Sequence, residues 1–450
     1  MVRAVVALGL TCACSTSSTP RATDAKGSDA EDTGPTGDEE PTCWGLEPAA
    51  LMDCAPGGPR PCILWRSTTV LSGQPGNMQP AVTELGSFVV TRLVAVPNRE
   101  TFEGWSIFVS RHDGGHLRSD SFASNTGPSS PTLWGDCVVA KGGDYGVTVS
   151  CFEKYSHLAE DTVLKDGSGA FVVLSHDRMA YSCSSDTCMT TQPDHAHEKV
   201  FPGLVLRSGG YGGALAGVCV TENAVCMRDG VTGALKWATP DTSLPSWITL
   251  SEIVPASGRW TYLLGGFGAP VDKTIRFVAV DDTGAVVFDH DLGVVPGITQ
   301  WVVAGPIHAG GDDVTVGVWQ TVTRIRIGTG PQWARDLGER IDSELLMDDQ
   351  LTTYVLTQPP QPAPPTCAGR RLWALGPDGE TRWTAGVPSR GFRGELGMDR
   401  EGRLLVNGPD WLMLLDTDAT GLAPTEWPKR FGGYGNENRP FTEPAIPSWM

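Results

Sequence analysis

Short apolar runs that end in an Asp/Gly turn recur in the C-terminal half of the chain. After each turn, polar and apolar positions alternate up to an aromatic residue. Residues 225–237 read VCMRDGVTGALKW, residues 277–288 read FVAVDDTGAVVF, and residues 372–383 read LWALGPDGETRW. Alternation with a period of two predicts half-buried strands, and Asp-Gly or Thr-Gly supplies the positive φ that a tight turn needs. Each copy is therefore a predicted β-hairpin.

The spacing of these hairpins predicts the architecture. The aromatic lies four residues after the turn glycine in all three copies, and looser copies surround Gly330 with Trp333 and Gly421 with Trp427. Successive turn glycines are 42 to 51 residues apart, which is typical of a four-stranded propeller blade. An aromatic at a constant offset can fill the gap between neighbouring blades. A β-sandwich with regular hairpins is the alternative.

The N-terminal half carries weaker copies of the same pattern. Residues 106–118 look like a weaker copy with Gly115 at the turn, residues 170–177 give a strand and a turn start, and residues 138–149 give a hairpin around a Gly-rich turn. The 55 glycines and 34 prolines disfavour long helices. We therefore predict an all-β chain in which residues 43–450 form a β-propeller of about seven or eight four-stranded blades.

The repeat units resemble pyrroloquinoline-quinone-like (PQQ-like) propeller repeats, which share the pattern of apolar strand, Asp, Thr-Gly and Trp. The resemblance is clearest over residues 219–440 and includes residues 427–438, WPKRFGGYGNEN, which look like a Trp-Pro…Phe…Asn segment of many secreted members. The resemblance implies a repeat architecture and no particular activity. Most lipoprotein members of this family bind no quinone, and some are scaffolds in outer-membrane protein assembly.

The first residues predict export. Residues 1–14 read MVRAVVALGLTCAC, in which one positive charge precedes an apolar run too short to span a bilayer. The segment up to Cys14 resembles a bacterial lipoprotein signal, which implies cleavage before Cys14 and acylation of that residue. Thr11 stands where such signals usually have Leu, and Cys12 is a competing acceptor. Ordinary secretion with cleavage nearby is the alternative.

Residues 15–42 predict a disordered, acidic linker. They contain seven acidic and two basic residues and almost no apolar ones, a composition that cannot build a core. A linker after a lipidated cysteine would hold the folded domain at a membrane surface without a transmembrane helix. We therefore expect an extracytoplasmic protein that is secreted or lipid-anchored at the bacterial outer membrane.

The ten cysteines beyond the linker predict five disulfides, because an even number after an export signal usually pairs. Three pairs are close enough to join across a hairpin: Cys137–Cys151, Cys183–Cys188 and Cys219–Cys226. The connectivity of Cys43, Cys54, Cys62 and Cys367 stays open. One bond among these four could link the N-terminal segment to the last blades and help to close the ring.

Metal sites are only weakly indicated. His195 and His197 would share one face of a strand and could chelate a divalent metal, but the polar residues before them also fit an exposed loop. The pair His112 and His116 flanks a predicted hairpin turn. The Asp-rich turns 281–284 and 416–421 resemble calcium loops, yet they lack the late bidentate Glu, and Asp in a turn normally caps the backbone.

The net charge and the absence of known catalytic motifs disfavour several classes of function. The formal net charge of −18 disfavours nucleic-acid binding, which needs a clustered basic surface. The sequence has no Gly-x-Ser-x-Gly, His-Glu-x-x-His or Walker motif, and no Cys-Cys dipeptide of the kind that PQQ dehydrogenases have. We therefore expect a non-catalytic binding or scaffold surface for a protein or glycan of the cell envelope, without a cofactor. The alternatives are a propeller enzyme, either a quinoprotein dehydrogenase or a polysaccharide hydrolase or lyase, and an outer-membrane protein assembly factor.

Overall fold

A computed structural model describes a large part of the chain. The described residues are 49–67, 74–75, 79–83, 87–95, 102–124, 132–134, 137–141, 147–151, 172–174, 180–183, 187–191, 199–202, 204–209, 214–219, 222, 224–240, 249–256, 259–267, 272–296, 303–358, 369–388, 394–408, 411–425 and 427–429. The chain divides into two compact units, Met1–Thr42 and Cys43–Met450, and all described residues belong to the second unit. None of them forms a helix long and apolar enough to cross a membrane.

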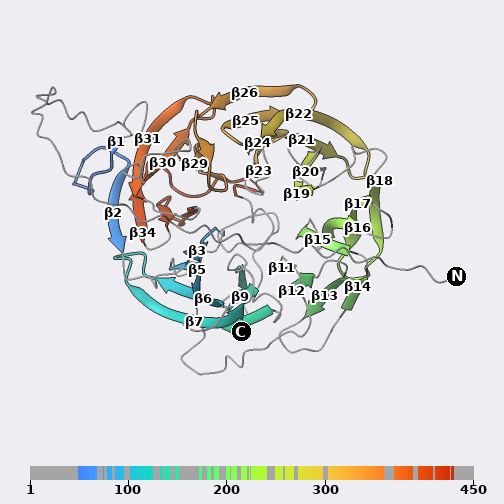
Figure 1. The fold of residues 1–450 in the computed structure, drawn as a ribbon, viewed down its shortest axis with the longest axis horizontal. Coiled ribbons are helices and arrows are strands. Elements are labelled where there is room, and N and C mark those ends of the chain that lie inside the picture. Colours follow the sequence, from blue (N-terminus) through green and yellow to red (C-terminus); the bar gives the residue numbers. More distant parts are fainter. Residues whose placement is uncertain are drawn as a thin grey trace, which may run out of the picture. The chain divides into compact units, whose positions relative to one another are not determined.

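The described strands of the second unit form eight sheets, which follow one another around a common centre (Figure 1). We number them as blades in chain order. Blade 1 contains β3 (Gln74–Pro75), β4 (Ala81–Val82), β5 (Phe88–Ala95), β6 (Phe102–Val109) and β7 (His116–Ser124). Blade 2 contains β8 (Thr132–Trp134), β9 (Cys137–Lys141) and β10 (Val147–Cys151). Blade 3 contains β11 (Val172–Leu174), β12 (Ala180–Cys183), β13 (Thr187–Thr191) and β14 (Lys199–Pro202).

Blades 4 to 6 are regular four-stranded antiparallel sheets. Blade 4 contains β15 (Leu204–Gly209), β16 (Ala214–Cys219), β17 (Ala224–Asp229) and β18 (Leu235–Pro240). Blade 5 contains β19 (Thr249–Ala256), β20 (Trp260–Phe267), β21 (Asp272–Val280) and β22 (Val286–Pro296). Blade 6 contains β23 (Val303–Gly310), β24 (Asp313–Val318), β25 (Thr321–Arg326) and β26 (Gly330–Asp336).

Blades 7 and 8 combine both ends of the folded unit. Blade 7 contains β27 (Arg340–Ile341), β28 (Leu346–Met347), β29 (Thr353–Gln358), β30 (Gly369–Leu375) and β31 (Thr381–Pro388), with β1 (Ala49–Ala50) parallel to β31. Blade 8 contains β32 (Glu395–Met398), β33 (Leu404–Asn407) and β34 (Leu412–Asp416), and its outer strand is β2 (Cys62–Ser67). The predicted all-β propeller is thus confirmed, with eight sheets among the described residues.

The ring closes by strand pairing. Strand β2 pairs antiparallel with β34, with Cys62 opposite Asp416 and Ser67 opposite Leu412. A strand from the start of the folded unit therefore supplies the missing edge of the last blade, which removes an unpaired sheet edge. Cys62 forms its disulfide with Cys54, so this bond lies within the N-terminal segment and does not link it to the last blades.

The aromatic after each turn lies between two blades, as predicted. A Cβ atom at Gly284 of blade 5 would lie 3.1 Å from the ring of Trp237 of blade 4. At Gly379 of blade 7, it would lie 2.6 Å from the ring of Trp333. Both glycines have positive φ values, +84° and +81°, so only glycine combines the turn geometry with this close approach.

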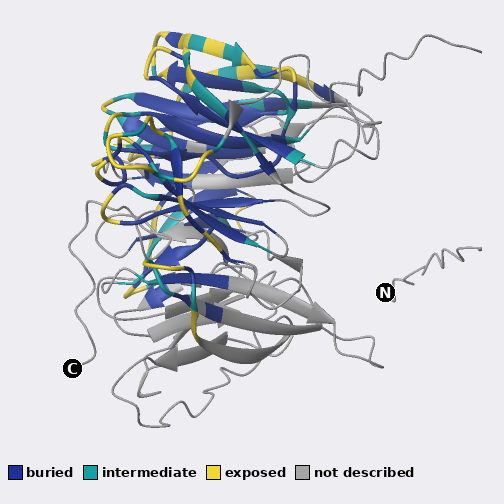
Figure 2. Cartoon of the chain, turned by 90° about the vertical axis from the view of Figure 1, so that its left-hand side faces the viewer, coloured by how far each residue is buried: buried dark blue, intermediate teal, exposed yellow. Residues whose placement is uncertain are grey.

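A third contact between a tryptophan and a turn glycine joins blade 8, the last, to blade 1, the first. Trp65 on β2 packs against Gly114 of blade 1, where an added Cβ would lie 2.6 Å from the indole. Its Nε1 donates a 3.0 Å hydrogen bond to the carbonyl of Arg111. The same arrangement occurs at Trp333, whose Nε1 donates to the carbonyl of Pro377 at 2.8 Å. Buried apolar residues fill the blades, and exposed ones gather at turns and outer strands (Figure 2).

Two expectations about repeat copies need correction. Gly421 and Trp427 do not form a blade hairpin, because β2 takes the outer position of blade 8 and the chain after β34 turns into the ring. In the copy at residues 106–118, the residue with positive φ is Gly114 (+70°), while the expected turn glycine, Gly115, donates its amide to the Asp113 carboxylate at 2.9 Å.

The cysteine expectations are met where the side chains are described. Cys219 and Cys226 form a disulfide between β16 and β17. The register places Cys137 directly opposite Cys151 and Cys183 directly opposite Cys188, which is the relative position that each predicted bond requires. Those two bonds stay predictions, and Cys43 and Cys367 lie outside the described residues.

Candidate functional site

The chain after blade 8 enters the centre of the ring, and we call residues 421–429 the central segment. It runs antiparallel to the inner edge of blade 7, with bridges from Leu422 to Asp348 and from Lys429 to Leu346. The amide of Ala423 donates to Met347 at 3.0 Å, and the amide of Met347 donates to Pro428 at 2.8 Å. The segment therefore adds an inner strand-like edge to blade 7.

Trp427 anchors the central segment between blades 5 and 6. Its side chain is fully buried and belongs to a cluster with Tyr262 and Phe277 of blade 5 and Val316 of blade 6. Its Nε1 donates a hydrogen bond to the carbonyl of Pro255, which satisfies the polar atom that a buried indole carries. The backbone carbonyl of Trp427 accepts a 2.8 Å hydrogen bond from the amide of His308 on β23.

Lys429 connects the central segment to blade 1. Its side chain is only 1% exposed, and its Nζ donates to the carbonyl of Pro80 at 3.3 Å. Beside it, Nε2 of Gln79 donates to the carbonyl of Leu345 at 3.2 Å. A buried ammonium group is retained only where polar groups receive it. The central segment thus joins blades 1, 5, 6 and 7 through specific hydrogen bonds.

A buried group of charged side chains lies at one end of blade 7. Arg371 pairs with Glu339 at 3.1 Å, Thr357 donates its hydroxyl to Glu339 at 2.5 Å, and Nε1 of Trp373 donates to Thr357 at 2.9 Å. Burial raises the pKa of Glu339, and the hydrogen bond from Thr357 and the charge of Arg371 oppose this shift.

A second ion pair joins Arg370 to Asp342 in the same blade, with Arg340 3.9 Å from Asp342. Each acid in this group has a named basic partner, and the contacts join β27, β29 and β30. The Thr357 hydroxyl is held between the Glu339 carboxylate and the Trp373 indole. The group is therefore best explained as a contact that fixes the strands of blade 7.

The candidate metal ligands are only partly described. His195 and His197 lie outside the described residues, as does Cys14. His112 and His116 flank the β6–β7 turn, in which the Asp113 carboxylate accepts the Gly115 amide. In the described part of the chain, the acids and thiols that come close enough to hold an ion are Cys54, Cys62 and Asp416. The two sulfurs form a disulfide, and Asp416 pairs with Arg60 at 2.9 Å, so this group does not offer thiolate ligands.

The Asp281 turn shows how the acidic turns of the repeat use their carboxylates. Oδ1 of Asp281 accepts hydrogen bonds from the Thr283 hydroxyl at 2.6 Å, the Thr283 amide at 2.9 Å and the Ala285 amide at 3.0 Å. Asp229, Asp348 and Asp399 also accept amides from the residues that follow them. These carboxylates cap turns, as Asp in such positions normally does.

We predict that Asp281 titrates below the ordinary range of an Asp carboxyl. The Thr283 hydroxyl, followed by the amides of the turn, lowers the pKa of Asp281. The linked stability is present above the ordinary carboxyl pKa and is lost as the pH falls through the lowered one. Carbon-13 NMR titration should show the low value, and Thr283→Val should move it back towards normal. A titration curve that moves when calcium is added would instead identify Asp281 as a calcium ligand.

The central segment is the feature that sequence patterns missed. The Trp-Pro-Lys run at residues 427–429 follows the last apolar strand, and the repeat pattern alone predicts that its Trp belongs to a further copy. The available signal was the offset: Trp427 lies six residues after Gly421 instead of four.

Comparison with known proteins supports the fold. No family model matches the sequence, and no curated protein matches it either. Among similar solved structures, Sqt1 from Saccharomyces cerevisiae has a TM-score of 0.51 at 10% identity over 79% of this chain and 99% of its own. The Dos1 propeller has a TM-score of 0.50 at 9% identity over 79% and 95%. BamB from Moraxella catarrhalis has a TM-score of 0.44 at 11% identity over 79% and 87%. The similarity to Sqt1 and to the Dos1 propeller supports the β-propeller fold and nothing more specific.

Proposed function

We propose that this chain is a lipid-anchored β-propeller of the bacterial cell envelope that binds a protein or glycan partner on its outer surfaces and has no catalytic centre. The PQQ-like repeat would serve as a scaffold without quinone or calcium. One observation carries the proposal: residues of the chain itself occupy the centre of the ring. Trp427 and Lys429 are buried there among blades 1, 5, 6 and 7.

The position of the central segment matters for function because the central channel of a propeller is a common place for a ligand site. Blades arranged around an axis leave a central channel, and small-molecule sites are concave and mostly preformed. The central segment lies along the inner strands of blades 6 and 7, and its Trp427 is fully buried between blades 5 and 6. The faces and outer strands then provide the area for contact, and their loops carry specificity.

The outer strands of blades 4 and 5 offer exposed apolar side chains for such contact. Leu235 of β18 is 45% exposed, and Val287 and Val294 of β22 are 41% and 62% exposed. Along β22, exposed positions alternate with half-buried ones over most of the strand. Strand edges of this kind accept partners through backbone hydrogen bonds and side-chain contacts.

Photocrosslinking in the native cell tests the proposal. A photoreactive amino acid would be placed at the exposed positions Leu235, Val287 and Val294, and at the buried position Lys429 as a control. We expect adducts of one defined mass at neighbouring outer positions and none at the control. Adducts at none of the exposed positions, or a thermal shift of several degrees when quinone and calcium are added to the full chain, would contradict surface binding without catalysis.

The membrane anchor gives a separate prediction. Cys14→Ser should move the protein from the detergent phase to the aqueous phase of a Triton X-114 extraction, because the only acylated residue is lost. Cys12→Ser is the matched control and should leave the protein in the detergent phase. Intact mass should show a diacylglyceryl group on Cys14 in the wild type. A detergent-phase Cys14→Ser protein would exclude Cys14 as the acylated residue.

A further inference from the structure

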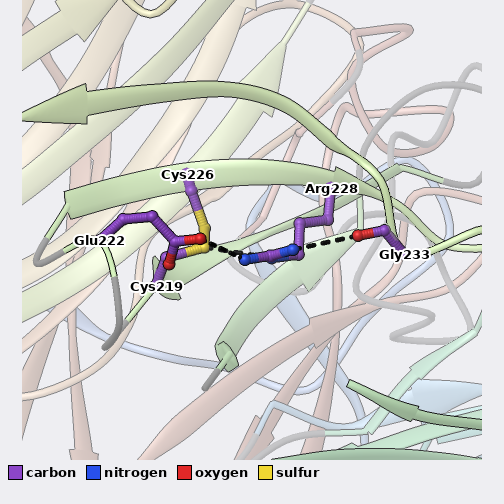
Figure 3. Close-up of a disulfide and its surroundings, with 5 residues drawn as sticks. All are labelled: Cys219, Glu222, Cys226, Arg228 and Gly233. Atoms are coloured by element: carbon purple, nitrogen blue, oxygen red, sulfur yellow. Dashed lines mark hydrogen bonds and ion pairs between the residues drawn. A yellow bond between two sulfur atoms is a disulfide. The ribbon is translucent and has the colours of Figure 1, made fainter. Parts of the chain in front are cut away.

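The two described disulfides have different charged side chains close to their sulfurs, a guanidinium at one and a carboxylate at the other. At Cys219–Cys226, the Arg228 guanidinium donates from Nε to Sγ of Cys219 at 3.3 Å (Figure 3). At Cys54–Cys62, a carboxylate oxygen of Asp416, which also pairs with Arg60 at 2.9 Å, lies within 4.8 Å of both sulfurs. A cation beside sulfur stabilises a thiolate, and an anion disfavours it. The two disulfides therefore differ in the charged group that would lie beside a thiolate formed on reduction.

Arg228 is held in this position by contacts on both sides. Nη2 pairs with Glu222 at 2.7 Å, and Nη1 donates to the carbonyl of Gly233 at 3.1 Å (Figure 3). On the neighbouring strand β16, the residue opposite Cys226 is Gly217, which has no side chain. The guanidinium is thus oriented before any sulfur is released, and no rearrangement is required for it to receive the charge.

We propose that Cys219–Cys226 is a thiol–disulfide exchange site for an extracytoplasmic dithiol reductant, with Cys219 as the leaving thiolate and Arg228 as the residue that positions and stabilises it. Cys54–Cys62 is then the structural bond. The pair lies beside a hairpin end, since Cys219 is the last residue of β16 and Cys226 is the third of β17. Strand ends open at lower free energy than strand centres, which provides access to sulfurs that are buried in the closed state.

The dithiol reductant supplies both electrons that the exchange requires. One thiolate of the dithiol attacks Sγ of Cys226, the bond between the two protein sulfurs breaks, and its electron pair remains on Sγ of Cys219. The second thiolate of the reductant attacks the reductant's own sulfur in the mixed disulfide and releases Cys226 as a thiolate. The reductant leaves as its disulfide, the protein gains two electrons, and a leaving thiolate that is already stabilised departs faster.

Equilibration of the full chain in buffers of reduced and oxidised dithiothreitol tests the proposal. Acid quenching, alkylation and peptide mass spectrometry give the reduced fraction of each disulfide. We expect Cys219–Cys226 to be half reduced where Cys54–Cys62 remains more than about 90% oxidised. Arg228→Gln should make Cys219–Cys226 about tenfold harder to reduce, which is about 30 mV for a two-electron couple.

Two further variants keep the test decisive if Arg228→Gln folds poorly. Glu222→Gln removes the competing carboxylate from Arg228 and should ease reduction of Cys219–Cys226 about threefold. Arg60→Gln removes the ion-pair partner of Asp416 beside Cys54–Cys62. It is the control, and it should leave the reduction midpoint of Cys219–Cys226 unchanged. Equal midpoints for the two bonds, or no change at Cys219–Cys226 in both Arg228→Gln and Glu222→Gln, would overturn the proposal.

Discussion

Trp427→Ala is expected to lower the free energy of unfolding by about 3 to 5 kcal/mol, the usual cost of removing a buried aromatic side chain. The side chain is fully buried among residues of blades 5 and 6, so truncation leaves a cavity that two rigid sheets cannot fill. It also leaves the carbonyl of Pro255 without its indole donor. The loss should free the central segment from the ring centre.

Urea denaturation followed by tryptophan fluorescence and circular dichroism measures this effect. Trp427→Phe keeps most of the apolar contact but loses the indole donor, and should cost about 1 to 2 kcal/mol. Val294→Ala on β22 is the surface control and should change stability by less than about 0.5 kcal/mol. A Trp427→Ala protein as stable as the wild type would show that the central segment contributes little to the fold.

Gly402→Ala is expected to cost more than about 3 kcal/mol or to prevent accumulation of folded protein. Gly402 has a φ of +77°, and a Cβ there would lie 2.1 Å from the backbone oxygen of Ala419. That oxygen belongs to the chain just before the central segment, and the Thr417 hydroxyl also donates to the Gly402 carbonyl at 2.8 Å. Relief of the clash requires the backbone itself to move.

Gly328→Ala is the matched control for this prediction. Gly328 also has a positive φ, +83°, but nothing lies within 4 Å of an added Cβ. Its substitution should cost only the left-handed strain of about 1 to 2 kcal/mol. The difference between the two denaturation midpoints isolates the close approach at Ala419. If both alanines cost the same, the approach at Gly402 has no energetic consequence.

The blades could be predicted because their signals are local. A hairpin, its turn glycine and the aromatic that follows are encoded within about a dozen residues, and the same set recurs at Gly233, Gly284 and Gly379. The steric requirement at each turn explains the repetition, since Trp237 and Trp333 each need a glycine on the next blade. Cys219–Cys226 was predictable for the same reason, because both residues belong to one hairpin.

Features that depend on long-range pairing could not be predicted. Strand β2 meets β34, which lies about 350 residues away in the chain, and no local pattern specifies that partner. Trp427 looked like a blade aromatic because sequence spacing cannot show that the outer position of blade 8 was already filled. Lys429 carried no signal of burial, since its Nζ is received by the carbonyl of Pro80, about 350 residues away in the chain.

Functional residues were the least predictable for a physical reason. The acidic turn at residues 281–284 looks like a calcium loop in sequence, but Oδ1 of Asp281 accepts hydrogen bonds from the turn itself. The contact between Arg228 and Cys219 joins residues nine positions apart on adjacent strands and follows from the register of one hairpin.

Hydrogen–deuterium exchange of the full chain shows whether the central segment is held against the inner strands of the ring. The amides of Ala423, His308 and Met347 donate to carbonyls in the contact between the central segment and the inner strands. If the segment fills the ring, these amides should exchange as slowly as those of the blade cores, and Trp427→Ala should accelerate all three. Exchange within seconds in the wild type would show that the segment is not held there, and would leave the centre of the ring available to a ligand.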